Sequence, residues 1–199
     1  MSDRLSSLLA RFELRAAVFH AGGLCGPSET DGAGSGGQLH LLRRGRIEHG
    51  DADGARQTLE GPALLYYPRP HRHTLWAPTS GNVELVCLDV DFGAGAGNRL
   101  MHALPPVLAL PMAELPALAP TVELLWAEAL GGRCGRRAAV DRLAEVRGGQ
   151  LLSHLMQHRR LDGGVLAGLA DARLARALNA IHDDPGGDWT LARLAAQAG

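Results

Sequence analysis

The stretch that decides the fold is LEGPALLYYPRPHRH, residues 59–73. A turn glycine, Gly61, precedes the apolar run Ala63–Tyr67, and two prolines separate this run from His71 and His73. A short apolar run bounded by Gly and Pro is typical of a buried β-strand. We therefore expect a buried strand at 63–67, followed by a strand that begins at His73.

Similar short runs extend from residue 16 to about residue 92. Gly, Pro, Asp and Asn break them, and closely spaced strands of this kind indicate a β sandwich or barrel. The glycine-rich segment 32–37 lacks GxGxxG spacing before a helix, so we interpret it as a loop and not as a phosphate site. The expected strands are Ala16–His20, Gln38–Arg43, Gln57–Leu59, Ala63–Tyr67, His73–Trp76 and Val83–Phe92.

Helical periodicity dominates after residue 98. The apolar spacing predicts helices over 116–130 and 136–158, and Gly148-Gly149 inside the second predicts a kink or a close helix contact. A short amphipathic helix is also expected in the first 15 residues. Strands followed by helices define an α+β fold class.

Composition excludes several classes of function. The net charge is −1 and all 20 cationic residues are Arg, so no bulk basic charge points to nucleic acid. The chain has no apolar stretch long enough for a transmembrane helix and no secretory signal. Its three cysteines lack the spacing of a disulfide framework. We expect a cytoplasmic, reduced protein without a membrane partner.

The C-terminal residues 169–199 read LADARLARALNAIHDDPGGDWTLARLAAQAG. One apolar helical stripe ends at Pro185, and Thr190 then offers the N-cap of a second helix. Gly199 supplies a left-handed turn after that helix. The stripes comprise Leu174, Leu178 and Ile181, then Leu191, Leu194, Ala195 and Ala198.

The run from Asp171 to Ala195 closely resembles the opening of the DNA-binding domain of AraC-type transcriptional regulators. In that family the turn corresponding to Gly199 is followed by the recognition helix, which enters the major groove. The resemblance implies a bacterial regulator cut inside its first helix-turn-helix, which binds DNA through the full-length protein. It leaves no DNA-contacting residue in this chain.

Residues 59–73 resemble the second conserved stretch of a cupin barrel in AraC-type sensor domains. With the C-terminal run, the resemblance covers almost the whole chain. It implies an α+β fold in which a cupin-like β-barrel (a double-stranded β-helix) is followed by C-terminal helices. The other pieces that carry it are residues 19–26, 39–42 with Gly45, 85–87 and 104–106.

The resemblance also implies three parts. Residues 1–108 would form the cupin-like sensor domain, 109–168 a helical dimerisation and linker segment, and 169–199 the start of an incomplete helix-turn-helix domain. An effector in the barrel would then shift the placement of two DNA-reading modules. We expect a homodimer through the apolar face of helix 136–158, formed by Val140, Leu143, Leu151 and Leu155.

The alternatives to this regulator are a metal-dependent cupin enzyme, a stand-alone metal- or redox-binding cupin, and a truncated sensor that only dimerises. In enzymatic cupins, an HxH pair is joined by a Glu four or five residues later. Here His71 and His73 are followed by no carboxylate until Glu84. We therefore expect no catalytic residue and no enzyme.

A metal or redox site is a further hypothesis, because thiolate and imidazole groups suit tetrahedral zinc. Cys25 and Cys87 could share a zinc ion with histidines or close into a disulfide under oxidant. Buried apolar cysteines and satisfied histidines are the alternative. The effector is thus a small molecule, a metal or an oxidant, and the candidate residues are Cys25, Cys87, His20, His40, His71 and His73.

Overall fold

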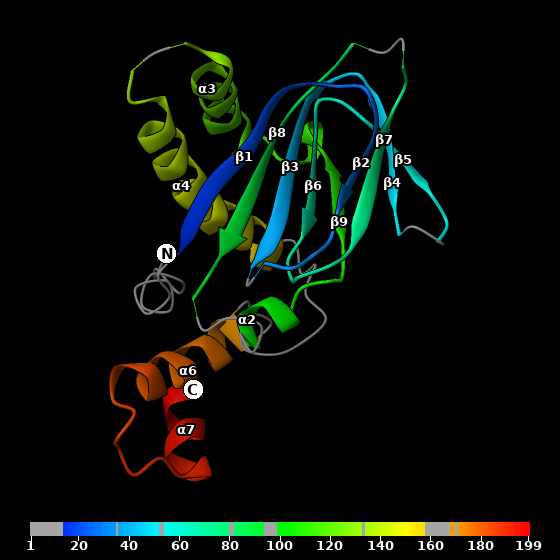
Figure 1. Cartoon of the computed structure of the whole chain (residues 1–199). Helices are drawn as coiled ribbons and strands as arrows, with labels where there is room; N and C mark the ends of the chain where they lie inside the picture. The colour runs from blue at the N-terminus through cyan, green and yellow to red at the C-terminus, as the bar shows by residue number, and fades with distance from the viewer. Residues whose placement is uncertain are drawn as a thin grey trace.

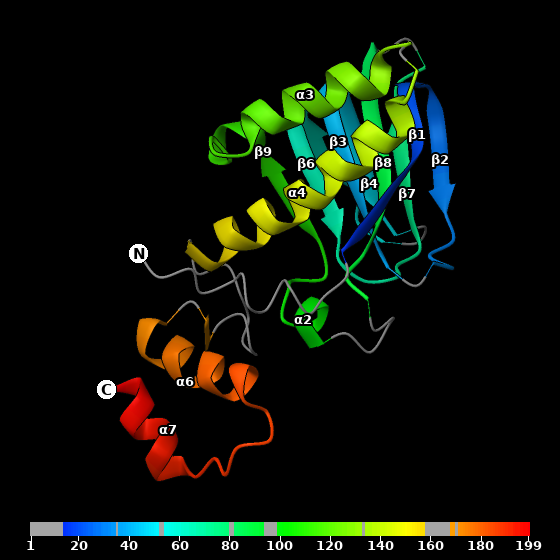
Figure 2. The ribbon, with the colours of Figure 1, turned by 90° about the vertical axis from the view of Figure 1, so that its left-hand side faces the viewer.

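The computed structural model describes residues 14–34, 36–51, 54–79, 82–93, 99–132, 134–157, 168–169 and 171–199. Two antiparallel β-sheets lie face to face, and two long helices cover the outer face of the larger sheet (Figures 1 and 2). Almost all of the expected N-terminal helix, and residues 158–167 of the expected dimerisation and linker segment, lie outside the described residues. The α+β fold class is confirmed.

The larger sheet has five strands in the order β1-β8-β3-β6-β9. Its buried strand β6 coincides with the run predicted at 63–67, because five consecutive apolar or aromatic residues are covered on both faces. The strands are β1 (Arg15–Leu24), β8 (Val83–Asp91), β3 (Gly37–Arg44), β6 (Ala63–Tyr67) and β9 (Leu108–Pro111).

The smaller sheet has four strands in the order β2-β7-β4-β5. Gly45, with φ of +91°, turns the chain from β3 into β4, and a Cβ there would lie 2.9 Å from Val83 Cα. The strands are β2 (Gly26–Thr30), β7 (His73–Ala77), β4 (Arg46–Gly50) and β5 (Gln57–Glu60).

Three strands were not predicted, and the sequence signal is weak in each for a different reason. β2 is an edge strand of small and polar residues, so it lacks an apolar signal. In β4, only two residues, Ile47 and His49, are buried, and they alternate with charged residues, so the apolar signal is short. β9 is four residues long and follows a Pro-Pro turn. Because β9 pairs with β6, the sheet continues past residue 108, where we expected the sensor domain to end.

The helices predicted after residue 98 are present. α3 starts three residues later than expected, after a 3-10 turn, and α4 runs without a break through Gly148-Gly149. No helix of the described residues is long and apolar enough to cross a membrane. The helical elements are α2 (Arg99–His102), the 3-10 turn η2 (Met112–Glu114), α3 (Ala119–Leu130), α4 (Arg136–Gln157), α6 (Ala172–Asp183) and α7 (Leu191–Ala198).

The apolar face of α4 is used within the chain. Val140, Leu151 and Leu155 are almost fully buried in the core that α4 forms with α3 and the large sheet. The prediction of a dimer interface on this face is therefore wrong in its location, because these side chains are already packed against residues of the same chain. What remains exposed on the two helices includes Leu124 and Val146.

The last two helices lie at one end of the sandwich, beyond α2 (Figure 1). The Asp171 carboxylate caps α6 by accepting hydrogen bonds from the backbone N–H groups of residues 173 and 174. The Thr190 hydroxyl caps α7 in the same way, and Gly199 adopts the expected left-handed conformation at φ +82°. The helix boundaries predicted from Pro185, Thr190 and Gly199 are confirmed.

Strand alternation gives the large sheet two different faces. On β3, Leu39 and Leu41 point toward the helices, whereas His40 and Leu42 point toward the small sheet. The helix side joins one large apolar cluster that includes Trp126 and Leu125 of α3. The inter-sheet side holds a smaller apolar cluster together with a group of histidines.

Candidate effector cavity between the sheets

A row of three chemically active side chains crosses the inner face of the large sheet. His20 on β1 pairs with Cys87 on β8, and Cys87 in turn pairs with His40 on β3. Neighbouring strands are about 4.8 Å apart, so the three residues form one continuous row. The sequence places them far apart, and the strand order brings them together.

A β-bulge sets the position of His20. The register between β1 and β8 shifts between Val18 and His20, which leaves Phe19 as the extra residue. A bulge re-aims the side chains that follow it. Phe19 is consequently half exposed, and its ring meets the His40 ring edge-on at 6.3 Å between centroids.

The small sheet and β6 supply the other polar groups. His73 Nε2 lies 2.9 Å from His40 Nε2, and His49 Nδ1 lies 3.2 Å from the Tyr67 hydroxyl. The Tyr67 ring also stacks on the His73 ring, with 3.9 Å between centroids. All four side chains are at most 3% exposed. The space between the sheets thus contains a connected polar network.

Burial keeps this network uncharged. Desolvation, helped by the neighbouring His73, His49 and His20, lowers the pKa of His40 to about 3. Desolvation likewise lowers the pKa of His49 and His73, although the His71 carbonyl opposes the change at His73. Burial also raises the pKa of Cys87 to about 12. At neutral pH, His40, His49 and His73 are neutral and Cys87 is a thiol.

Through His40, the network borders a cavity of about 290 Å³ on the side of the edge strands β1 and β2. This volume is at the lower end of the range of small-molecule sites, roughly 300–1,000 Å³. Three lining residues, His20, Cys87 and His40, form the row on the large sheet. The rest of the lining is Phe19, Leu24, Ser28, Glu29, Thr30, Leu75 and Leu85.

Three of the six site residues predicted from the sequence do not line this cavity: His71, His73 and Cys25. His71 is at the rim of the sandwich, where its Nε2 lies 2.6 Å from the Asp51 carboxylate. Cys25 is exposed, and its thiol contacts the Thr79 carbonyl oxygen. The His71-His73 pair therefore does not converge on one point, because His73 turns inward to His40.

The expected pairing of Cys25 with Cys87 is not formed. Leu24, the neighbour of Cys25, lies opposite Val83, four residues before Cys87. At about 3.3 Å per residue this is roughly 13 Å along the strand, whereas a disulfide needs Cα atoms within about 7 Å. In the part of the chain that the structure describes, no group of three or more His, Cys, Asp or Glu side chains has the arrangement of a metal site.

Sequence reasoning missed His49 and Tyr67, which complete the network. The sequence did contain a signal for His49. Ile47 and His49 alternate with charged residues in β4, so the two side chains lie on the same face of the strand. Tyr67 was recognised only as part of a buried strand. Its hydroxyl needs a partner when buried, and His49 is that partner.

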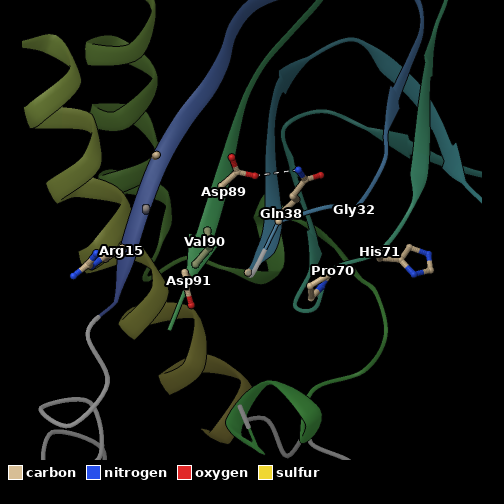
Figure 3. A pocket seen from close by; sticks show the side chains of 12 residues that line it. Arg15, Gly32, Gln38, Pro70, His71, Asp89, Val90 and Asp91 are labelled. Atoms are coloured by element: carbon tan, nitrogen blue, oxygen red, sulfur yellow. Dashed lines mark hydrogen bonds between the residues drawn. The ribbon is translucent and has the colours of Figure 1, made fainter. Parts of the chain in front are cut away.

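A second hollow, a surface cleft of about 260 Å³, lies at the ends of β1, β3 and β8 (Figure 3). Gln38 Nε2 donates a hydrogen bond of 3.0 Å to the Asp89 carboxylate there. Arg15 and Asp89 are exposed, so water solvates the charges of this cleft. The cavity between the sheets, with its buried polar groups, is therefore the stronger candidate site.

Comparison with known proteins agrees with the fold and the patterns in the sequence. A cupin family model, Cupin_6, matches residues 3–157, and the chain belongs to this family. The chain is 30% identical over 169 residues to a Streptomyces lividans protein named an AraC-like transcription regulator, covering 81% of this chain and 54% of that protein. The resemblance to AraC-type regulators with a cupin-like domain is thereby confirmed.

A second relative is an HTH-type transcriptional regulator of Haemophilus influenzae, 33% identical over 99 residues, which cover 50% of this chain and 33% of that protein. The chain thus spans about half, or less, of the length of these relatives. Among solved structures, apo ToxT K231A of Vibrio cholerae aligns with a TM-score of 0.41 at 9% identity, covering 94% of this chain and 69% of that chain. The AraC-like activator CuxR aligns with a TM-score of 0.40 at 13% identity, covering 87% and 62%.

Proposed function

We propose that this chain is the effector-sensing part of an AraC-type transcription regulator, and that a small molecule bound between the two sheets is its signal. The chain would regulate transcription through DNA-binding helices of which α6 and α7 are the first. A regulator acts where the DNA is, so the proposed location is the bacterial cytoplasm. The proposal keeps the expected division into sensor, helical segment and helix-turn-helix, with β9 added to the sensor.

The observation that carries the proposal is a cavity lined by two histidines, each of which has a buried nitrogen with no hydrogen-bond partner among the described residues. These nitrogens are His20 Nε2 and His40 Nδ1. Leaving such groups unpaired costs about 1–3 kcal/mol each, and a ligand that hydrogen-bonds to them would remove this cost. The relatives, named as transcription regulators, support a sensing role and not a catalytic one.

A metal or oxidant effector is the second candidate. The row of His20, Cys87 and His40 favours it, because imidazole and thiol groups from adjacent strands face one cavity. Two observations count against it: the Cys87 thiol stays protonated, and Cys25 lies too far away to take part. Elemental analysis of the purified protein after dialysis against zinc decides: stoichiometric zinc that is lost in Cys87→Ala would favour this candidate.

A homodimer remains part of the proposal, with its interface moved to the outer side of α3 and α4. Leu124 and Val146 are 48% and 54% exposed there, although both are large apolar residues. Sedimentation of the variant Leu124→Asp/Val146→Asp should give monomers where the unaltered protein gives dimers. A dimer that is unchanged by both substitutions would place the interface elsewhere.

The regulatory role is tested with the complete gene product. Purified protein is mixed with fragmented genomic DNA from its host, and the retained fragments are sequenced. The proposal predicts a small set of selected fragments upstream of genes, whose transcripts change when the gene is deleted. Recovery of fragments in proportion to their abundance would overturn it.

A further inference from the structure

The hydrogen-bond chain between the sheets fixes which nitrogen of each histidine carries the proton. A carbonyl oxygen only accepts, so His73 Nδ1, 2.9 Å from the His71 carbonyl, must donate. A neutral His73 then has a bare Nε2, which accepts the proton of His40 Nε2 at 2.9 Å. A neutral His40 is left with a bare Nδ1, and this atom is buried without a partner.

The lining therefore includes a histidine whose unpaired ring nitrogen is an acceptor of fixed character. His40 Nδ1 cannot donate unless the whole chain of protons reverses, and the His71 carbonyl prevents that reversal. His20 Nε2, on the same lining, is a second buried atom without a partner. A ligand that satisfies this site must bring a hydrogen-bond donor to His40.

The charge of the lining excludes other ligands. Among the residues that the structure describes, no Arg lines the cavity, and the one carboxylate on the lining, Glu29, is exposed and paired with Arg72. An anion would find no cationic side chain there, and a cation would meet the buried neutral imidazole of His40. The rest of the lining combines apolar side chains with two hydroxyl groups: Phe19, Leu24, Leu75 and Leu85, then Ser28 and Thr30.

We propose that the cavity binds a small uncharged molecule with a ring-sized body and a hydroxyl or N–H group that donates to His40 Nδ1. This inference rests on the proposed function, since it names the chemical class of the effector. Phenol is the simplest probe of the class. Its ring can contact the apolar part of the lining, and its hydroxyl is the required donor.

Binding is measured by isothermal titration of the purified chain with phenol, anisole and benzoate at neutral pH. Anisole has nearly the same shape as phenol and lacks the donor, whereas benzoate carries a negative charge. Phenol should bind at least about tenfold more tightly than either, because only phenol pairs the buried acceptor. Equal binding of phenol and anisole overturns the proposal, as does tighter binding of benzoate.

Two variants locate the contact. His40→Phe removes the acceptor and should reduce the preference for phenol over anisole to about onefold. His40→Gln keeps an acceptor oxygen beside a donor amide, and should retain part of the preference. A preference that survives His40→Phe overturns the proposal, and if that variant does not fold, the comparison of phenol with anisole on the unaltered chain still decides. Since none of these measurements involves DNA, their failure would leave the regulatory role to its own test.

Discussion

The two faces of the large sheet are built from the same strands and do opposite things. The buried cluster on the face toward α3 and α4 is almost entirely apolar, and its polar groups are paired. The Trp126 indole N–H donates to the Leu41 carbonyl oxygen at 3.2 Å, and the Tyr66 hydroxyl donates to the Met101 sulfur at 3.5 Å. The face toward the small sheet contains His40 and Cys87 and borders a cavity (Figure 2 shows both layers). Successive residues of β3 thus alternate between a packed core and a polar site.

Under the proposed function, one face of the large sheet stabilises the fold and the other face binds a ligand. Close packing on the helix face stabilises the fold, since a buried apolar side chain loses both transfer energy and contacts when it is shortened. On the inter-sheet face, buried nitrogens such as His40 Nδ1 have no hydrogen-bond partner among the described residues, which lowers stability. Substitutions on the two faces should therefore have different consequences.

The largest effect is expected on the helix face. Leu125→Ala removes a fully buried side chain from the core between α3 and the sheet, and should lower the free energy of unfolding by about 2–5 kcal/mol. Urea denaturation measures the change. The matched control is Leu191→Ala, the same substitution at a leucine of α7 that is 87% exposed, which should stay within about 0.5 kcal/mol. Equal losses at both positions would break the distinction between the packed core and the exposed surface.

A smaller effect, limited to the inter-sheet face, is expected from pH. His40, His49 and His73 have lowered pKa values in the folded protein, so between about pH 3 and 6.5 the unfolded chain binds more protons. Stability is then greatest above about pH 6.5 and falls as the pH falls. From pH 7.5 to pH 5, His40 alone should account for about 2 kcal/mol.

Urea denaturation at several pH values checks this dependence. The matched variant is His40→Phe, in which the decrease toward low pH should be visibly smaller, whereas Leu191→Ala should retain it in full. A free energy of unfolding that is constant from pH 7.5 to pH 5 would mean that the histidines are not buried and neutral.

The smallest effect sharpens the comparison within the polar network. His40→Phe and His73→Phe each leave one nitrogen buried without its partner, and Phe at 73 keeps a ring against Tyr67. The double variant removes both nitrogens, so it should lose less stability than the sum of the single variants, with a coupling of about 1 kcal/mol. Strict additivity in denaturation experiments would show that the two imidazoles do not interact.

Much of the fold follows from local patterns in the sequence. The buried strand at 63–67, the helices α3 and α4, and the caps Thr190 and Gly199 are each determined by residues within about twenty positions. The strand β2 was missed because an edge strand of polar residues carries no periodic signal. Local physics also misled us at α4, since an apolar stripe does not say whether its partner is the same chain or a second copy.

The site was harder to predict, because it depends on strand order. His40 and His73 were among the candidates and do meet, whereas Cys25 was expected beside Cys87 and lies near Thr79 instead. Residue types suggest which groups can act, but register decides which of them share a face. His49 on β4 and Tyr67 on β6 belong to different sheets, and no spacing in the sequence shows that these two strands face each other.

The central claim is that His40, which lines the cavity, is a neutral imidazole with one bare, buried nitrogen. A long-range proton–nitrogen correlation spectrum of the labelled chain reads the protonation of each histidine nitrogen directly. The account predicts that His40 is protonated at Nε2 and bare at Nδ1, and that this state is unchanged from pH 7.5 to pH 5.5. A His40 that carries its proton on Nδ1, or that becomes a charged imidazolium by pH 5.5, would contradict it.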